Sequence, residues 1–136
     1  MSNNTNPLLE QYFPKKSFKD LLSIGPDSAP ESVREAIGCI EQMMREQARN
    51  ITYTQLRNIL QEVKKDEFKD KLSKFYLVIP KLAYMEARLQ KEKGRKVIAF
   101  IREMASELNT STEYEAFKEI MNALVAYHKL HGQNTN

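Results

Sequence analysis

The chain has 136 residues, of which 41% are hydrophobic and 29% are charged, and its formal net charge at pH 7 is +3. This length favours one domain with a real core and is too short for two, and the composition excludes an intrinsically disordered chain. No apolar run is long enough to span a membrane, and the first residues lack the basic and apolar regions of a signal peptide. The single cysteine, Cys39, excludes an internal disulfide. We therefore expect a cytoplasmic protein without a membrane partner.

The N-terminal part of the chain is polar and carries Pro7 and Pro14. Residues 1–26 are expected to form a polar arm, with a short helix at residues 17–22. Gly25 and Pro26 predict the loop that ends this arm. The helical bundle is expected to cover residues 27–132, followed by a flexible tail at residues 133–136.

Three helix starts are predicted from capping boxes, in which a hydroxyl side chain and an acidic or amide side chain three residues later each satisfy a free backbone N–H group. The three pairs are Ser28 with Glu31, Thr52 with Gln55, and Thr112 with Glu115. The first predicts a helix at about 29–49, and the second a helix that continues to about Lys65, with Ile51 packing on Leu56 across the cap. The third predicts the last helix, which Gly132 ends.

Two more helices are predicted around Pro80. Apolar residues from Phe68 to Ile79 keep helical spacing, and this helix should break or kink near Ile79 because the residue before a proline avoids the α region. Pro80 suits the first turn of the next helix, which we expect to reach about Glu92, with Gly94 as its stop.

A further helix is predicted from the apolar spacing of Val97, Phe100, Ile101, Met104 and Leu108. No strand or hairpin pattern is found anywhere in the sequence. The fold class is therefore expected to be all-α, a compact bundle of five to six helices.

The middle of the chain is its basic part. Residues 74–102 carry eight Lys and Arg against two Glu, a net charge of +6, whereas residues 27–46 and residues 103–136 each carry −3. Such asymmetry is typical of a surface that binds a polyanion, although the mixed charge of ordinary helix surfaces explains it equally well.

One stripe on the Pro80 helix has the side chains that an RNA strand requires. Lys81, Tyr84, Arg88 and Lys91 follow one another at spacings of three, four and three, which places them on one helix face. Cations suit phosphates and the ring suits a base or sugar face. Tyr84 has alanine neighbours, however, so a buried ring that locks the helix into the bundle is an equally good interpretation.

The candidate cations fall into two groups. Arg57, Lys81 and Arg88 each follow a structural cue, either the Thr52 cap or Pro80. The second group surrounds Gly94, where a loop between helices would expose it, and consists of Lys91, Lys93, Arg95 and Lys96. Solubility alone explains any one lysine, whereas the cluster as a whole favours polyanion binding.

Catalytic and metal chemistry find no support in the sequence. It has no Gly-rich phosphate loop, no paired cysteines and no nucleophile elbow. His128 and His131 lack further metal ligands, so a polar helix end is their ordinary explanation. Cys39 lies among apolar residues and is expected to be a buried, inert thiol. No catalytic residue, metal or cofactor is therefore expected.

Three ordered segments resemble one known family. Thr52-x-Thr54-Gln55-Leu56-Arg57 resembles its Thr-x-x-Gln-Ile-Arg motif, Pro80-Lys81-Leu82-Ala83-Tyr84 with Arg88 resembles its Pro-Lys-Leu-Ala-Tyr…Arg motif, and Ala123 to Lys129 resembles its Ala-x-Val-Ala-Tyr-His-Lys ending. The family is the small subunit of the Csm-type (type III-A) CRISPR–Cas interference complex. Asn122 stands where the family usually has Glu, and Gly132-Gln133 replaces a Gly-Gly ending.

The resemblance implies a non-catalytic helical bundle that acts in antiviral defence in the prokaryotic cytoplasm. Copies would stack beside the backbone subunit and contact crRNA and target RNA, while other subunits cleave the target. By motif position the implied RNA contacts are Arg57, Lys81, Arg88 and Lys129. Binding through phosphates would be independent of sequence, as a complex that accepts any guide requires. The alternative is a helical adaptor that binds only protein.

Overall fold

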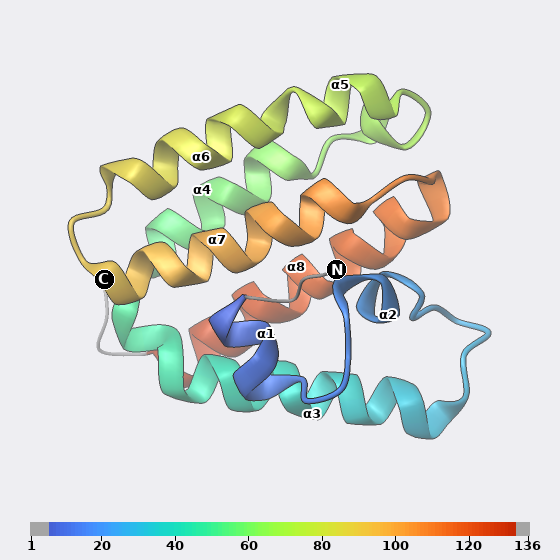
Figure 1. The fold of residues 1–136 in the computed structure, drawn as a ribbon, viewed down its shortest axis with the longest axis horizontal. Coiled ribbons are helices and arrows are strands. Elements are labelled where there is room, and N and C mark those ends of the chain that lie inside the picture. The colour runs from blue at the N-terminus through green and yellow to red at the C-terminus, as the bar shows by residue number, and fades with distance from the viewer. Residues whose placement is uncertain (1–5, 133–136) are drawn as a thin grey trace.

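The computed structural model describes residues 6–132, in which helices are joined by short loops and no strand is formed (Figure 1). Five of the eight α-helices in this part of the chain have 11 to 21 residues, which confirms the all-α bundle. The α-helices are α1 (Pro7–Tyr12), α2 (Phe18–Leu22), α3 (Pro30–Gln47), α4 (Tyr53–Val63), α5 (Leu72–Tyr76), α6 (Val78–Arg88), α7 (Glu92–Glu107) and α8 (Ser111–His131). Two 3-10 helices, η1 (Ala48–Asn50) and η2 (Asp66–Lys69), lie beside α4 in the sequence.

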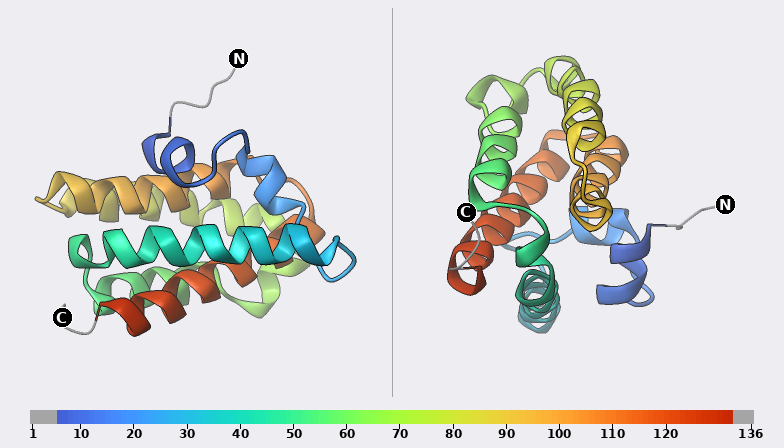
Figure 2. Two further views of the ribbon diagram at one scale, coloured as in Figure 1. Left: turned by 90° about the horizontal axis from the view of Figure 1, so that it is seen from below. Right: turned by 90° about the vertical axis from the view of Figure 1, so that its left-hand side faces the viewer.

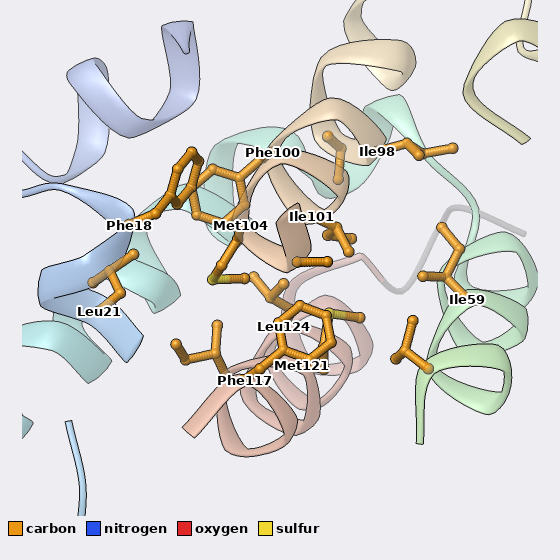
Figure 3. Close-up of a cluster of buried hydrophobic side chains, with 14 of the residues drawn as sticks. Phe18, Leu21, Ile59, Ile98, Phe100, Ile101, Met104, Phe117, Met121 and Leu124 are labelled. Atoms are coloured by element: carbon orange, nitrogen blue, oxygen red, sulfur yellow. The ribbon is translucent and has the colours of Figure 1, made fainter. Parts of the chain in front are cut away.

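The long helices lie side by side around one core. α6 packs along α7, and α8 packs along both α3 and α4. Figures 1 and 2 show α3 along one edge of the bundle, α5 and α6 along the opposite edge, and α4 and α8 behind α7. Side chains from α7 and α8, including Phe100, Ile101, Met104, Phe117 and Leu124, meet in the middle (Figure 3). Within the described part of the chain, no helix is long and apolar enough to cross a bilayer.

The expectation of a loose N-terminal arm is wrong for the residues that the structure describes there. Pro7–Tyr12 and Phe18–Leu22 are helices, and their apolar side chains are part of the core. Phe13 stacks on Phe100 of α7 and Phe18 meets the same ring edge-on. The predicted short helix at 17–22 is confirmed and begins with its own capping box, Ser17 with Asp20. The predicted tail at residues 133–136 lies outside the described residues.

One of the three predicted capping boxes is confirmed. Thr52 Oγ1 accepts from the Gln55 N–H, and Gln55 Oε1 accepts from the Thr52 N–H. The predicted start of α8 is wrong by two residues: Thr110, not Thr112, accepts from the N–H of Glu113, and the helix begins at Ser111. Gly132 ends α8 as predicted.

The first predicted capping box is wrong, although its helix exists. α3 begins at Pro30, and the preceding Ala29 offers no side-chain cap. Ser28 Oγ instead accepts from the N–H of Gly25 and so belongs to the turn before the helix. Pro30 replaces the box because the first residue of a helix needs no N–H and benefits from the fixed φ of proline.

The helix boundaries around Pro80 are also corrected. The break lies at Leu77, and Pro80 is the third residue of α6. The N–H groups in the first turn of a helix have no intrahelical acceptor, so a proline at this position costs no hydrogen bond. α6 ends at Arg88 rather than near Glu92 because Leu89 is extended. Gly94 is not a stop: it is buried in the first turn of α7. A Cβ on Gly94 would lie 2.5 Å from the carbonyl oxygen of Asn50, so η1 and α7 can approach this closely only at a glycine.

Candidate nucleic-acid interface

Most of the predicted cations gather at one end of the bundle. Here α6 ends, α7 begins, α3 passes through η1 into α4, and α8 ends, on the left of Figure 1 and facing the viewer on the right of Figure 2. We call this region the basic end. It carries Arg49, Arg57, Arg88, Lys91, Lys93, Arg95, Lys96 and Lys129.

A buried histidine holds the basic end together. His128 is fully buried, and its Nε2 lies 2.6 Å from the Ile51 carbonyl oxygen and 3.1 Å from the Ala48 carbonyl oxygen. Both partners are acceptors, so Nε2 carries a hydrogen and donates it to them. The imidazole therefore ties α8 to the corner between α3 and α4. The sequence interpretation of His128 as an ordinary polar helix end is wrong.

Five of the eight predicted cations form no ion pair or hydrogen bond within residues 6–132. These are Arg57 on α4, Arg88 at the end of α6, Lys93 and Lys96 on α7, and Lys129 on α8, and all five are exposed. Lys129 lies with its Nζ 4.9 Å from the centre of the Tyr53 ring, and the Arg88 guanidinium lies 5.6 Å from the centre of the Tyr84 ring. Their charges are therefore available to an anionic ligand.

The other three predicted cations contact the protein itself. Lys81 lies 3.6 Å from Oε1 of Glu62, longer than a hydrogen bond, and it sits nearer the middle of α6 than the basic end. Lys91 Nζ donates to the Arg49 carbonyl, and Arg95 Nη1 donates to the Leu89 carbonyl at 2.6 Å. Lys91 and Arg95 thus help to fix the turn between α6 and α7 while they add positive charge to this end.

The predicted stripe is shorter than expected. α6 ends at Arg88, so Lys91 precedes α7 and does not continue the face formed by Lys81, Tyr84 and Arg88. Tyr84 is 65% exposed, which excludes the interpretation that its ring locks α6 into the bundle. Tyr127 of α8 is half-buried, and its ring stacks on that of His131.

Two cations within the basic residues 74–102 are neutralised by ion pairs inside the protein. Arg102 donates from Nε to Glu86 at 2.7 Å, which clamps α7 to α6 and raises the pKa of the guanidinium. Lys74 pairs with Glu67 at 3.0 Å.

Arg49 belongs to the basic end although the sequence did not indicate it. It is exposed on η1, and the hydrogen bond from Lys91 to its carbonyl holds the start of α7 beside it. No sequence signal separated Arg49 from the acidic helix that it follows.

The remaining candidates for metal binding or catalysis, His131 and Cys39, have surroundings that favour neither role. His131 pairs with Glu41 at 2.9 Å, and among residues 6–132 no group of three His, Cys, Asp or Glu side chains could hold a metal. Cys39 is half-buried rather than fully buried, and burial together with the nearby Glu35 raises the pKa of its thiol. A raised pKa lowers the thiolate fraction and hence the nucleophilicity.

A second surface feature lies away from the basic end. A groove with an apolar lining runs between α3, the loop before it, and the middle of α8. Val33, Ile37, Ile120 and Ala123 contribute to its walls, and Ile37 is 42% exposed. Arg34 and Glu119 are charged residues that also line it. A groove of this kind suits an apolar side chain of a protein partner better than RNA.

The family model described as Csm2 Type III-A matches residues 30–134 of the chain. The match contains all three motifs, the His128 contacts and the whole basic end, whereas α1 and α2 lie before it. No curated protein and no solved structure gave a significant match.

Proposed function

Since the chain belongs to the Csm2 type III-A family, we propose that it is a non-catalytic small subunit of a type III-A CRISPR effector complex that binds crRNA and target RNA through its basic end. The observation that carries the RNA-binding part is the set of exposed, unpaired cations Arg57, Arg88, Lys93, Lys96 and Lys129 where five helices meet. Such an array attracts the phosphate backbone of RNA by releasing condensed counterions.

The proposed binding is independent of base sequence. Exposed Arg and Lys side chains contact phosphates, and phosphates carry no sequence information. Self-stacking and contact with the backbone subunit complete the proposal, with target cleavage assigned to other subunits. No catalytic residue is proposed in this chain.

Single substitutions test the RNA-binding part. We expect Arg57→Ala and Arg88→Ala each to weaken binding of a labelled single-stranded RNA, measured by fluorescence anisotropy at low salt, and to flatten the dependence of the dissociation constant on salt. Lys81→Ala should have the smallest effect of the three because Glu62 partly neutralises Lys81. Circular dichroism controls for folding. Wild-type affinity in all three variants would contradict the assignment.

The apolar groove between α3 and α8 favours a second candidate function, that of an adaptor that binds only protein. Ile37→Asp would place a charge on the groove wall. If the chain is only an adaptor, this variant loses its partner subunit in co-purification, and the unchanged chain shows no RNA binding at low salt. If the first proposal holds, Ile37→Asp binds RNA as the wild type does.

A further inference from the structure

We propose that Tyr84 is a stacking contact for an unpaired nucleotide, so that the basic end recognises single-stranded or flipped-out bases as well as phosphates. This inference rests on the proposed RNA-binding function and adds the class of nucleic-acid segment to it. It is carried by the exposure of one aromatic ring and by the cations that surround it.

Tyr84 differs from the other tyrosines of the described residues because it has neither a hydroxyl hydrogen bond nor a place against the core. Tyr12, Tyr76 and Tyr114 donate their hydroxyl groups to Glu46, the Leu108 carbonyl and the Val63 carbonyl, respectively. Tyr53 and Tyr127 are partly buried against the core. The Tyr84 hydroxyl makes no hydrogen bond within residues 6–132, and the side chain is 65% exposed. The ring contacts the Arg88 guanidinium, but with 65% of the side chain exposed it remains available to a ligand.

The surroundings of the ring suit a nucleotide. Arg88 lies one helical turn further along α6, about 6 Å, and its guanidinium lies 5.6 Å from the ring centre. The neighbouring Ala83 and Ala87 are small and exposed, so they leave space beside the ring. A base can therefore stack on the tyrosine while Arg88 binds the adjoining phosphate, a combination typical of proteins that bind single strands.

A second cation, Arg57 of α4, lies level with Tyr84 and Arg88. α4 and α6 run in opposite directions along the bundle (Figure 1), and the contact between Glu62 and Lys81 sets their register. Arg57 is five residues before Glu62, or about 7.5 Å along α4 toward the basic end. The same distance along α6 from Lys81 reaches the segment between Tyr84 and Arg88. A strand that crosses α6 at Tyr84 thus meets positive charge from both helices.

A base inside a duplex is already stacked on both faces, so the ring distinguishes single strands from duplexes. We expect Tyr84→Ala to weaken binding of single-stranded RNA by roughly 5- to 150-fold, the usual loss for one base–aromatic stack, and to leave duplex RNA affinity within about 2-fold of wild type. The salt dependence of single-strand binding should be unchanged, because no charge is removed. Tyr84→Phe should bind nearly as well as the wild type.

Leu77→Ala provides the matched control. Leu77 precedes α6 and is 71% exposed, so this variant removes an exposed apolar side chain without removing a π-face. We expect it to leave RNA binding unchanged. Equal weakening by Leu77→Ala and Tyr84→Ala would overturn the stacking role, as would a loss of self-association in both variants with RNA binding intact, which would make this face a protein contact.

Because the chain contains no Trp, Tyr84→Trp gives a fluorescence signal from this position alone. Single-stranded RNA should quench the Trp emission, whereas duplex RNA bound at the same occupancy should not. Arg57→Ala separates the two proposals: if it weakens RNA binding and Tyr84→Ala does not, only the stacking role fails. If neither variant changes binding, the proposed RNA-binding function fails as well.

Discussion

His128 makes the most consequential contacts of any single residue near the candidate site. Its Nε2 donates to two carbonyl oxygens, of Ala48 and Ile51, where the chain turns from α3 into α4. The same corner carries the Thr52 cap and the carbonyl of Arg49 that accepts from Lys91. The positions of the basic side chains therefore depend on a buried imidazole that does not itself reach the surface.

We expect His128→Ala to reduce the free energy of unfolding by about 2–4 kcal/mol, because it leaves two buried carbonyl groups without a donor and opens a cavity. His131→Ala is the matched control. His131 is partly exposed and pairs with Glu41, so its loss should change stability by less than about 1 kcal/mol. Urea unfolding followed by circular dichroism measures both. Similar values for the two variants would show that the buried contacts do not stabilise the corner.

Helix caps give a second prediction at the residue scale. Thr52→Ala removes the side-chain acceptor of a complete capping box and should destabilise the protein by about 1 kcal/mol in urea unfolding. Ser28 fits the capping-box pattern equally well but caps no helix. Ser28→Ala should therefore change the free energy of unfolding by less than about 0.5 kcal/mol. A larger loss from Ser28→Ala than from Thr52→Ala would contradict the cap assignments.

At the scale of elements, the existence of the long helices was predictable, whereas most of their ends were not. Apolar spacing reports which face of a segment is buried, and this holds for α3, α4, α7 and α8. The position of a helix end depends on which of several nearby residues caps it. α3 begins at Pro30 and not after a Ser28 cap, and α8 is capped by Thr110 and not by Thr112. In α1, Leu8, Leu9 and Tyr12 carried an apolar signal that the surrounding polar and proline residues obscured.

Gly94 shows how packing between elements overrides a local rule. Glycine after a run of helical residues ordinarily predicts a stop. Here the glycine lies within α7 because the Asn50 carbonyl leaves no room for a Cβ. Contacts between residues so far apart in the chain cannot be inferred from spacing.

Two glycine substitutions of opposite sign test this explanation. Gly94→Ala should destabilise the protein by about 1–3 kcal/mol, because the backbone of η1 must move away from α7. Gly38→Ala lies in the exposed middle of α3, where the new Cβ would meet nothing within 4 Å apart from its chain neighbours and the backbone of the helix itself, and should stabilise the protein by roughly 0.5–1 kcal/mol. Thermal unfolding of the two variants measures both changes. Stabilisation by Gly94→Ala would refute the close approach.

For the molecule as a whole, three carboxylates contribute to the response to acid. Tyr12 lowers the pKa of Glu46 through a hydrogen bond, as Lys74 does for Glu67 and Lys19 for Glu113. A glutamate whose pKa is lower in the folded state stabilises that state above its unfolded pKa, near 4.5, and this contribution is lost as the pH falls through the folded pKa. The contribution of these carboxylates to stability should therefore be fully present above about pH 5 and should decline below it.

Glu113→Gln tests this pH dependence. Because Glu113 accepts from Lys19 of α2 and from the Asn109 N–H, the variant should be less stable at pH 7 and should lose less stability than the wild type between pH 5 and pH 3. Lys19→Met removes the cation that pairs with Glu113 and should likewise reduce the loss of stability between pH 5 and pH 3. An unchanged slope in both variants would exclude this ion pair as a source of the acid response.

The candidate site was only partly predictable. The sequence predicted a cluster of cations in a loop around Gly94; the cluster exists, but Lys93, Arg95 and Lys96 lie on α7 and Lys91 directly precedes it. The sequence could not show that Lys81, Lys91 and Arg95 have contacts within the protein, that Arg102 is neutralised by Glu86, or that Arg49 joins the basic end. Each of these depends on a contact between helices, which charge counts along the chain do not contain.

The most direct test of the central proposal is the salt dependence of RNA binding by two variants of equal net charge. One replaces Arg57, Arg88, Lys93 and Lys96 at the basic end with Gln; the other replaces Lys64, Lys65, Lys69 and Lys71 near η2, toward the opposite end, with Gln (Figure 1). We predict that the basic-end variant binds RNA much more weakly and that its slope of log K against log salt concentration becomes shallower by about 0.7 for each RNA phosphate that it no longer binds. The variant near η2 should retain nearly the wild-type slope. Equal weakening of RNA binding in the two variants would contradict a localised RNA-binding surface at the basic end.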